Sequence, residues 1–97
     1  MIEVWLRPEA EADIEDIADY TIERWGPEQA RTYLAAIRAD IASLTKFTER
    51  FPIHEQTGLG LRRMLSGHHL VFYLVTDKAI EVVRVLHERR DPTRELR

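Results

Sequence analysis

Residues 61–87 read LRRMLSGHHLVFYLVTDKAIEVVRVLH and contain three apolar runs rich in β-branched and aromatic residues. Such runs are typical of strands, and the sequence predicts strands at 61–65, 69–75 and 80–87. The two intervening segments are short and rich in turn-forming residues, which favours two hairpins and an antiparallel meander. The middle run is apolar from Leu70 to Val75, so it is expected to be a central strand covered by helices on at least one face.

Two amphipathic helices are predicted before these strands, at 8–25 and 27–47. Pro8 and Pro27 suit the first position of a helix, and Gly26 permits the turn between the two helices. A joint this short favours an antiparallel hairpin. The residues expected on the buried faces recur every three or four positions: Ala10, Ile14, Ile17, Ala18, Thr21, Ile22 and Trp25, then Ala30, Leu34, Ile37, Ile41, Leu44 and Phe47.

A short strand is expected ahead of the first helix, because Ile2, Val4 and Leu6 alternate with residues of other types. Residues 48–60 contain Pro and Gly and are expected to form a loop with one helical turn. The charged segment 88–97 is expected to be a partly flexible tail.

The predicted fold class is therefore α+β. In the order β-α-α-β-β-β, an antiparallel helical hairpin packs on one mainly antiparallel four-stranded sheet. The whole chain, 1–97, is expected to be a single domain. The pattern does not identify the strand that pairs with the first one.

Composition limits the classes of function. The chain has 97 residues, which favours one domain, and the absence of cysteine favours a reducing compartment. The formal net charge of −3 argues against general or sequence-specific nucleic-acid binding. Residues 1–50 hold 11 acidic and 6 basic side chains, whereas residues 51–97 hold 6 acidic and 8 basic ones. We find no signal peptide or membrane-spanning run and expect a cytoplasmic protein that does not enter membranes.

No metal or cofactor is expected. His68 and His69 are adjacent, so in a strand they point to opposite faces, and no pair of histidines has the spacing of metal ligands. The Gly58-Leu59-Gly60 segment lacks the rest of a phosphate-binding fingerprint and precedes a strand.

Arg84 interrupts an apolar face of the last strand, where Ile80, Val82 and Leu86 are expected beside it. An unpaired buried guanidinium is costly, so two interpretations remain open. Arg84 either pairs with a carboxylate such as Glu3 or serves a functional site.

Basic residues gather at the predicted strands and strand ends, where a meander brings them toward one edge: Arg62, Arg63, Arg84, His87, Arg89 and Arg90. Such a cluster is suited to binding phosphates or an acidic protein surface. A ribonuclease would also need an acid and a base, for which His87 with Glu81 or Glu55 are candidates. Trp5 and Trp25 are either core residues or anchors for a partner.

Four pieces of the sequence, in this order, resemble the ParE toxins of the ParE/RelE superfamily. They are RPEAEADI from Arg7, IADY from Ile17 with Trp25-Gly26, GLR from Gly60 with GHHLVFY from Gly67, and RVLHERRDP from Arg84. The resemblance implies the same β-α-α-β-β-β fold, a ParD-like antitoxin in a toxin–antitoxin hetero-oligomer, and inhibition of DNA gyrase by binding, with no catalytic residues.

Contact sites are expected as well. Target contact is expected at the basic end of the last strand and in the tail, at Arg84, His87, Arg89, Arg90 and Arg94. Antitoxin contact is expected along the helical hairpin, at Ile14, Ile17, Trp25, Tyr33, Ile37 and Ile41. RelE-like relatives instead cut messenger RNA, and for that alternative the candidate catalytic residues are Arg63, Arg84 and His87. No tyrosine follows Tyr73 in this sequence, which argues against RNA cleavage.

Overall fold

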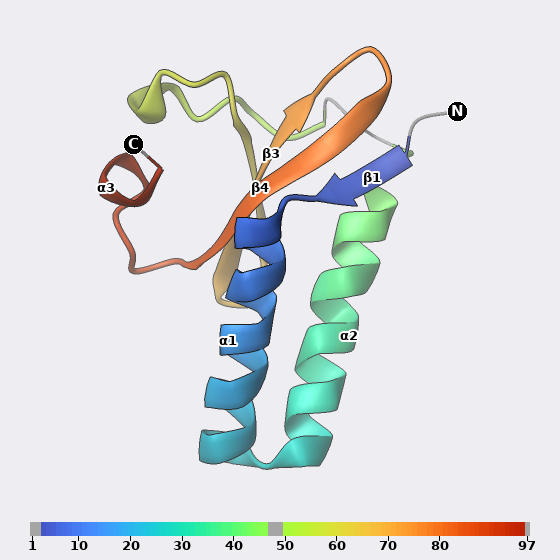
Figure 1. The fold of residues 1–97 in the computed structure, drawn as a ribbon, viewed down its shortest axis with the longest axis vertical. Coiled ribbons are helices and arrows are strands. Elements are labelled where there is room, and N and C mark those ends of the chain that lie inside the picture. Colours follow the sequence, from blue (N-terminus) through green and yellow to red (C-terminus); the bar gives the residue numbers. More distant parts are fainter. Residues whose placement is uncertain (1–2, 47–49, 97) are drawn as a thin grey trace.

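The computed structural model describes residues 3–46 and 50–96. Its elements follow the predicted order β-α-α-β-β-β, with two further short helices (Figure 1). They are β1 (Glu3–Leu6), α1 (Pro8–Trp25), α2 (Pro27–Ser43), η1 (Glu55–Thr57), β2 (Arg62–Ser66), β3 (His69–Val75), β4 (Ala79–His87) and α3 (Pro92–Glu95). The predicted α+β fold class is confirmed.

The four strands form one sheet in the order β1-β4-β3-β2. The two hairpins are antiparallel as predicted, whereas β1 lies parallel to β4, with Val4 opposite Ile80 and Leu6 opposite Val82. A parallel neighbour requires a long crossover, which α1 and α2 provide as they pass across the sheet. Both β3 and β4 are therefore interior strands, and the partner that the sequence left open is β4.

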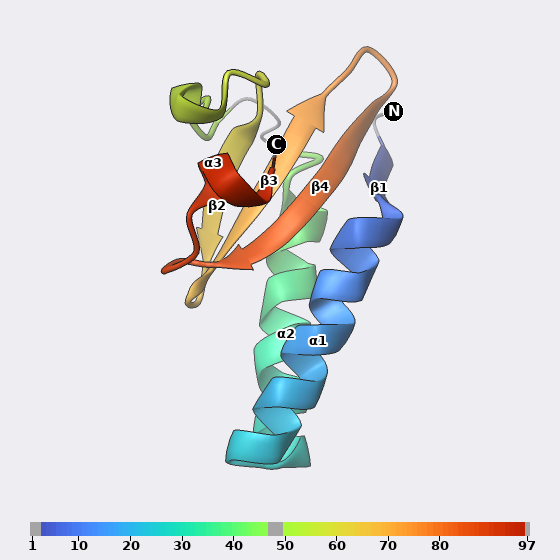
Figure 2. The ribbon, with the colours of Figure 1, turned by 60° about the vertical axis from the view of Figure 1, so that its left-hand side comes forward.

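Each face of the sheet carries its own apolar cluster. The helical hairpin covers one face, where residues such as Ile14, Ile37, Val71 and Val82 are at most 3% exposed. On the other face, Phe72 packs with the residues around it beneath α3 and the loop that contains η1 (Figure 2). That second cluster contains Leu61, Leu86, Leu70, Leu74, Val83 and Leu96.

A β-bulge in β4 changes the expected faces of that strand. Phe72 pairs with Arg84 and Tyr73 pairs with Val82, so Val83 is the extra residue. The period-two pattern is broken there, because one extra residue moves every later side chain to the opposite face. The expectation that Ile80, Val82, Arg84 and Leu86 share one face is therefore wrong beyond Val82: Val85 joins the helix-side cluster, and Leu86 joins the other one.

The helices extend well past the sheet, and this explains two errors in the predicted buried faces (Figures 1 and 2). Ile22 is 46% exposed and Trp25 is 60% exposed, because the far part of α1 has no strand beside it. The second helix ends at Ser43 rather than at residue 47, and turns continue to residue 46. Phe47 lies outside the described residues.

The segment after β4 contains the short helix α3, which the sequence did not predict. Asp91 caps it by accepting hydrogen bonds from the Thr93 backbone N–H at 3.0 Å and from the Thr93 hydroxyl at 2.6 Å. The expected partial flexibility of residues 88–97 stays a prediction. Within residues 3–46 and 50–96, no helix combines the length and the apolar character that crossing a membrane requires.

The turn between β2 and β3 gives a stability test. Gly67 has φ +59°, and a Cβ added there would lie 2.7 Å from the Tyr33 hydroxyl oxygen, whereas Gly58 has φ +68° and open space around it. We expect Gly58→Ala to lower the free energy of unfolding by about 1–2 kcal/mol from backbone strain alone. Gly67→Ala should lower the free energy of unfolding by about 1–3 kcal/mol more than Gly58→Ala, because the added methyl group is too close to Tyr33.

Urea unfolding of the two variants measures this difference. Because the Tyr33 hydroxyl oxygen is the atom nearest to the added methyl group, Tyr33→Phe should cost less stability in the Gly67→Ala background than in the wild type. Equal losses for Gly58→Ala and Gly67→Ala would contradict a steric role for Tyr33.

Candidate functional site

A groove runs between α1 and the ends of β3 and β4. Its first part, about 430 Å³ in volume, lies where Asp16 and Tyr20 of α1 face His87, Arg89 and Arg90. Its second part, about 390 Å³, continues along α1 to Trp25 and reaches Tyr33 of α2. Tyr20, His69 and His87 line both parts, so the two parts adjoin.

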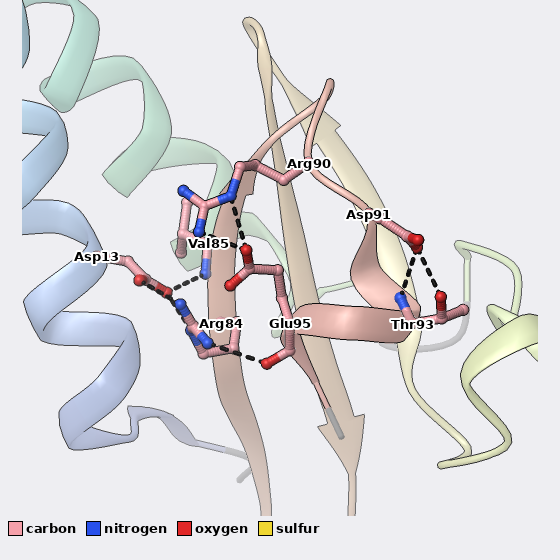
Figure 3. Close-up of polar contacts among 7 residues, drawn as sticks. All are labelled: Asp13, Arg84, Val85, Arg90, Asp91, Thr93 and Glu95. Carbon is pink, nitrogen blue, oxygen red and sulfur yellow. Dashed lines mark hydrogen bonds and ion pairs between the residues drawn. The ribbon is translucent and has the colours of Figure 1, made fainter.

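Asp13 and Arg84 form an ion pair at one end of this groove (Figure 3). The Arg84 Nε donates to Oδ2 of Asp13 at 2.7 Å, and the second contact, from Nη2 to Oδ1, is 2.9 Å long. Oδ2 also accepts the backbone N–H of Val85 at 2.9 Å. Hydrogen bonding to Asp13 raises the pKa of Arg84 above its ordinary value, although burial acts in the opposite direction.

The expected pairing of Arg84 with a carboxylate is therefore confirmed, but the proposed partner Glu3 is wrong. Glu3 lies opposite Ala79, at the other end of β4, whereas the bulge at Val83 directs Arg84 toward α1.

A second set of contacts fixes the segment after β4. Arg84 donates from Nη1 to the Glu95 carbonyl oxygen at 3.3 Å, and Arg90 donates from Nε to the Glu95 carboxylate at 2.9 Å (Figure 3). Arg90 keeps 55% of its side chain exposed in this arrangement. At this end of the groove, Arg90 is held by Glu95 and lies beside the exposed Arg89.

Three histidine rings form one wall of the groove. His87 stacks against His68 with ring centroids 6.4 Å apart and meets the edge of His69 at 5.2 Å. The Tyr33 hydroxyl lies 2.6 Å from Nδ1 of His69 and accepts the His68 backbone N–H at 2.9 Å. Burial, followed by the neighbouring His87 and His68, lowers the pKa of His69 to about 4. His69 is therefore neutral at pH 7. Through Tyr33, α2 contacts both His68 and His69.

The predicted basic cluster is divided by the fold. His87, Arg89 and Arg90 lie together at the groove, and Arg94 is exposed on α3. Arg62 and Arg63 belong to the edge strand β2, two strands away from β4. Arg62 donates to the Phe51 carbonyl oxygen at 2.7 Å.

The candidate ribonuclease residues are likewise spread out. Arg63 lines a separate depression of about 270 Å³ with His54 and Glu55, while His87 lies at the groove. Glu81 is bound by Arg7 at 2.8 Å. The structure therefore does not bring Arg63, Arg84 and His87 into one site.

Four of the residues expected to contact an antitoxin belong to the core. Ile14, Ile17, Ile37 and Ile41 are 1–8% exposed and pack between the helices and the sheet. The sheet of the chain itself covers Ile14, Ile37 and Ile41, which excludes them from a partner surface. Ile17, which is 8% exposed, lines the first part of the groove. Trp25 and the half-buried Tyr33 do line the groove.

The exposed tryptophans answer a question left open by the sequence. Trp5 is 62% exposed and Trp25 is 60% exposed, so the interpretation as core residues is wrong. Trp25 lines the groove, while Trp5 lies on the edge strand β1. No group of three or more histidine and acidic side chains suited to a metal ion occurs in the part of the chain that the structure describes.

Sequence reasoning missed Asp13 and His69. Asp13 follows Ala10 by three positions and precedes Ile17 by four, so it borders the buried face of α1. An acidic residue at such a border, together with an arginine inside an apolar strand, is a signal that could have paired Asp13 with Arg84. His69 gave no comparable signal, because its contacts come from two elements that are distant in the sequence, α2 and β4.

Comparison with known proteins agrees with this architecture. A solved structure described as the chromosomal ParDE TA system from P. aeruginosa superposes with a TM-score of 0.80, covering 90% of this chain and 96% of that chain at 20% sequence identity. The model of the family described as ParE toxin of type II toxin-antitoxin system, parDE, matches residues 4–92, and the chain belongs to this family.

Curated relatives support the assignment. Toxin ParE1 of Mycobacterium tuberculosis (strain CDC 1551 / Oshkosh) is 38% identical over 92 residues, which cover 94% of each chain. Toxin ParE1 of Caulobacter vibrioides is 39% identical over 79 residues, 81% of each chain. Toxin ParE of Escherichia coli is 38% identical over 87 residues, covering 89% of this chain and 84% of the relative.

The depressed pKa of His69 predicts a pH dependence of stability. The folded chain holds His69 neutral down to about pH 4, whereas an unfolded histidine gains its proton near pH 6.5. Between these values the unfolded state binds more protons, so the free energy of unfolding should fall as the pH drops from about 6.5 to about 4. His69→Gln should remove part of this slope in urea unfolding measured across the window.

His54, whose pKa is lowered mainly by burial, adds a slope of the same sign and remains in both proteins. The comparison is therefore between wild type and His69→Gln. An identical slope in the two proteins would contradict the assignment to His69.

Proposed function

We propose that this toxin inhibits DNA gyrase by binding it, without bond chemistry of its own, through the basic end of β4. The observation that carries this proposal is the exposed pair Arg89 and Arg90, which the fold presents beside a groove. Exposed guanidinium groups held in a fixed direction are suited to binding an acidic protein surface or phosphates. His87 and Arg94 extend the same surface.

Two observations support binding rather than catalysis. The side chain of Arg84, a candidate for stabilising a cleaved phosphate, is held by both carboxylate oxygens of Asp13. Arg63 lies at a different depression from His87, so the proposed ribonuclease set lacks a common centre. Catalysis of RNA cleavage requires an acid, a base and cations around one phosphate.

We also propose that a ParD-like antitoxin neutralises the toxin in a cytoplasmic hetero-oligomer. The surface that we assign to it is the part of the groove along α1, where Tyr20 is 59% exposed and Trp25 is 60% exposed. Exposed aromatic side chains beside a groove are typical anchors for a partner. Ile14 of α1 and Ile37 and Ile41 of α2 are buried against the sheet and are not part of this surface.

Inducible expression with pulse labelling tests the target. Wild type should stop DNA synthesis before protein synthesis, and purified gyrase should accumulate trapped cleavage complexes. Arg89→Ala with Arg90→Ala should raise the concentration needed for half-inhibition by at least about tenfold, the loss expected when well-placed interface contacts are truncated. Arg63→Ala, on the distant strand β2, is the control and should inhibit like wild type.

Early loss of protein synthesis with cut messages would contradict gyrase as the target and favour RNA cleavage. His87→Ala should then abolish cleavage while the protein still folds. A double arginine variant that folds and inhibits like wild type would refute the assigned contact surface.

The two exposed tryptophans test the antitoxin surface. Trp25→Ala should weaken binding of the co-expressed ParD-like antitoxin by about 2 kcal/mol or more, as expected for an aromatic anchor in a groove. Trp5→Ala removes an equally exposed tryptophan from β1 and should leave the affinity unchanged. Calorimetric titration of both variants measures the difference, and equal effects would contradict the proposed surface.

A further inference from the structure

Asp13 connects α1 to the end of β4 and, through it, to the segment that follows. Its carboxylate accepts two hydrogen bonds from Arg84 and one from the Val85 backbone N–H, each between 2.7 and 2.9 Å long. Arg84 in turn donates to the Glu95 carbonyl oxygen, and the Glu95 carboxylate accepts from Arg90. Figure 3 shows these contacts as one continuous chain from α1 to Arg90.

The end of β4 needs this contact because β1 is too short to hold it. The pairing of β1 with β4 ends at Val82, whose carbonyl oxygen accepts the Arg7 N–H at 2.9 Å. The bulge at Val83 follows directly, and the next backbone N–H directed toward α1, that of Val85, is bound by Asp13. A carboxylate thus takes the place that a neighbouring strand would otherwise occupy.

The opposite side of β4 is held separately. His87 pairs with His69 across the ladder, and the Glu88 N–H donates to the His68 carbonyl oxygen at 2.8 Å. The end of β4 is therefore held from two sides, by β3 at residues 87 and 88 and by Asp13 at residues 84 and 85. The side held by Asp13 is the one that carries the contacts to Arg90.

Resting on the proposed function, we propose that Asp13 is a positioning residue for target contact, which sets the direction of Arg90 and of the neighbouring Arg89 through Arg84 and Glu95. Asp13 itself does not meet the target. A fixed guanidinium binds a partner with less loss of side-chain freedom than a mobile one, so the contact chain contributes to affinity.

Asp13→Asn tests this inference with little change of shape. The asparagine oxygen still accepts from Val85, but its amide group turns a donor toward the donors of Arg84. Asp19→Asn is the matched control, because Asp19 is an exposed acidic residue of the same helix and does not line the groove. Arg84→Lys is a second variant, which keeps the charge and loses the two-pronged geometry.

Two measurements are made on each full-length variant: inhibition of purified gyrase and amide hydrogen exchange. We expect Asp13→Asn and Arg84→Lys to inhibit gyrase at least about tenfold more weakly, with faster exchange confined to residues 84–96. Asp19→Asn should match wild type in both. If Asp13→Asn fails to fold, Arg84→Lys decides the question by the same two criteria.

The outcomes separate the inference from the function on which it rests. A wild-type chain that leaves gyrase unaffected overturns the proposed function, and with it this inference. A wild type that inhibits gyrase, together with folded variants of equal potency, overturns the inference alone. Faster exchange spread equally over α2 and residues 84–96 also overturns it, because Asp13 would then act on the whole fold.

Discussion

The ion pair between Asp13 and Arg84 is the contact on which the end of β4 and the segment after it depend. It joins α1 to β4 where β1 has ended, and the two side chains are only 12% and 22% exposed. Removing one partner of such a buried pair typically costs about 3–5 kcal/mol, since the other charge is left without compensation. The same carboxylate satisfies the Val85 N–H after the bulge, so helix position, strand end and C-terminal segment are set together.

Much of the fold was predictable because its signals are local. Period-two and period-three-to-four patterns identified β3, β4, α1 and α2 within a few residues, and the two Pro-led helix starts were correct. The parallel pairing of β1 and the bulge at Val83 were not predictable, because both depend on which strands become neighbours. The bulge in turn reversed the expected face of Leu86.

The candidate site was predicted in part, and for a related reason. The sequence indicated His87, Arg89 and Arg90 because they follow one strand directly, and they do lie together. It placed Arg62 and Arg63 with them, although β2 lies at the far edge of the sheet. It also assigned Ile14 and Ile37 to a partner, because an apolar stripe looks the same whether the chain or a second protein covers it. Only burial separates these two cases.

The overhang of the helical hairpin beyond the sheet links recognition to the lifetime of the toxin. The near half of each helix lies against strands, whereas the helices extend beyond the sheet at their far ends (Figure 1). The far half of α1 exposes Tyr20, Ile22 and Trp25. Regions with few buried contacts open locally at lower free energy than the core. A partner that binds the folded overhang lowers the population of the locally opened state by mass action. Free toxin and toxin bound by the proposed antitoxin would then differ in their resistance to proteases.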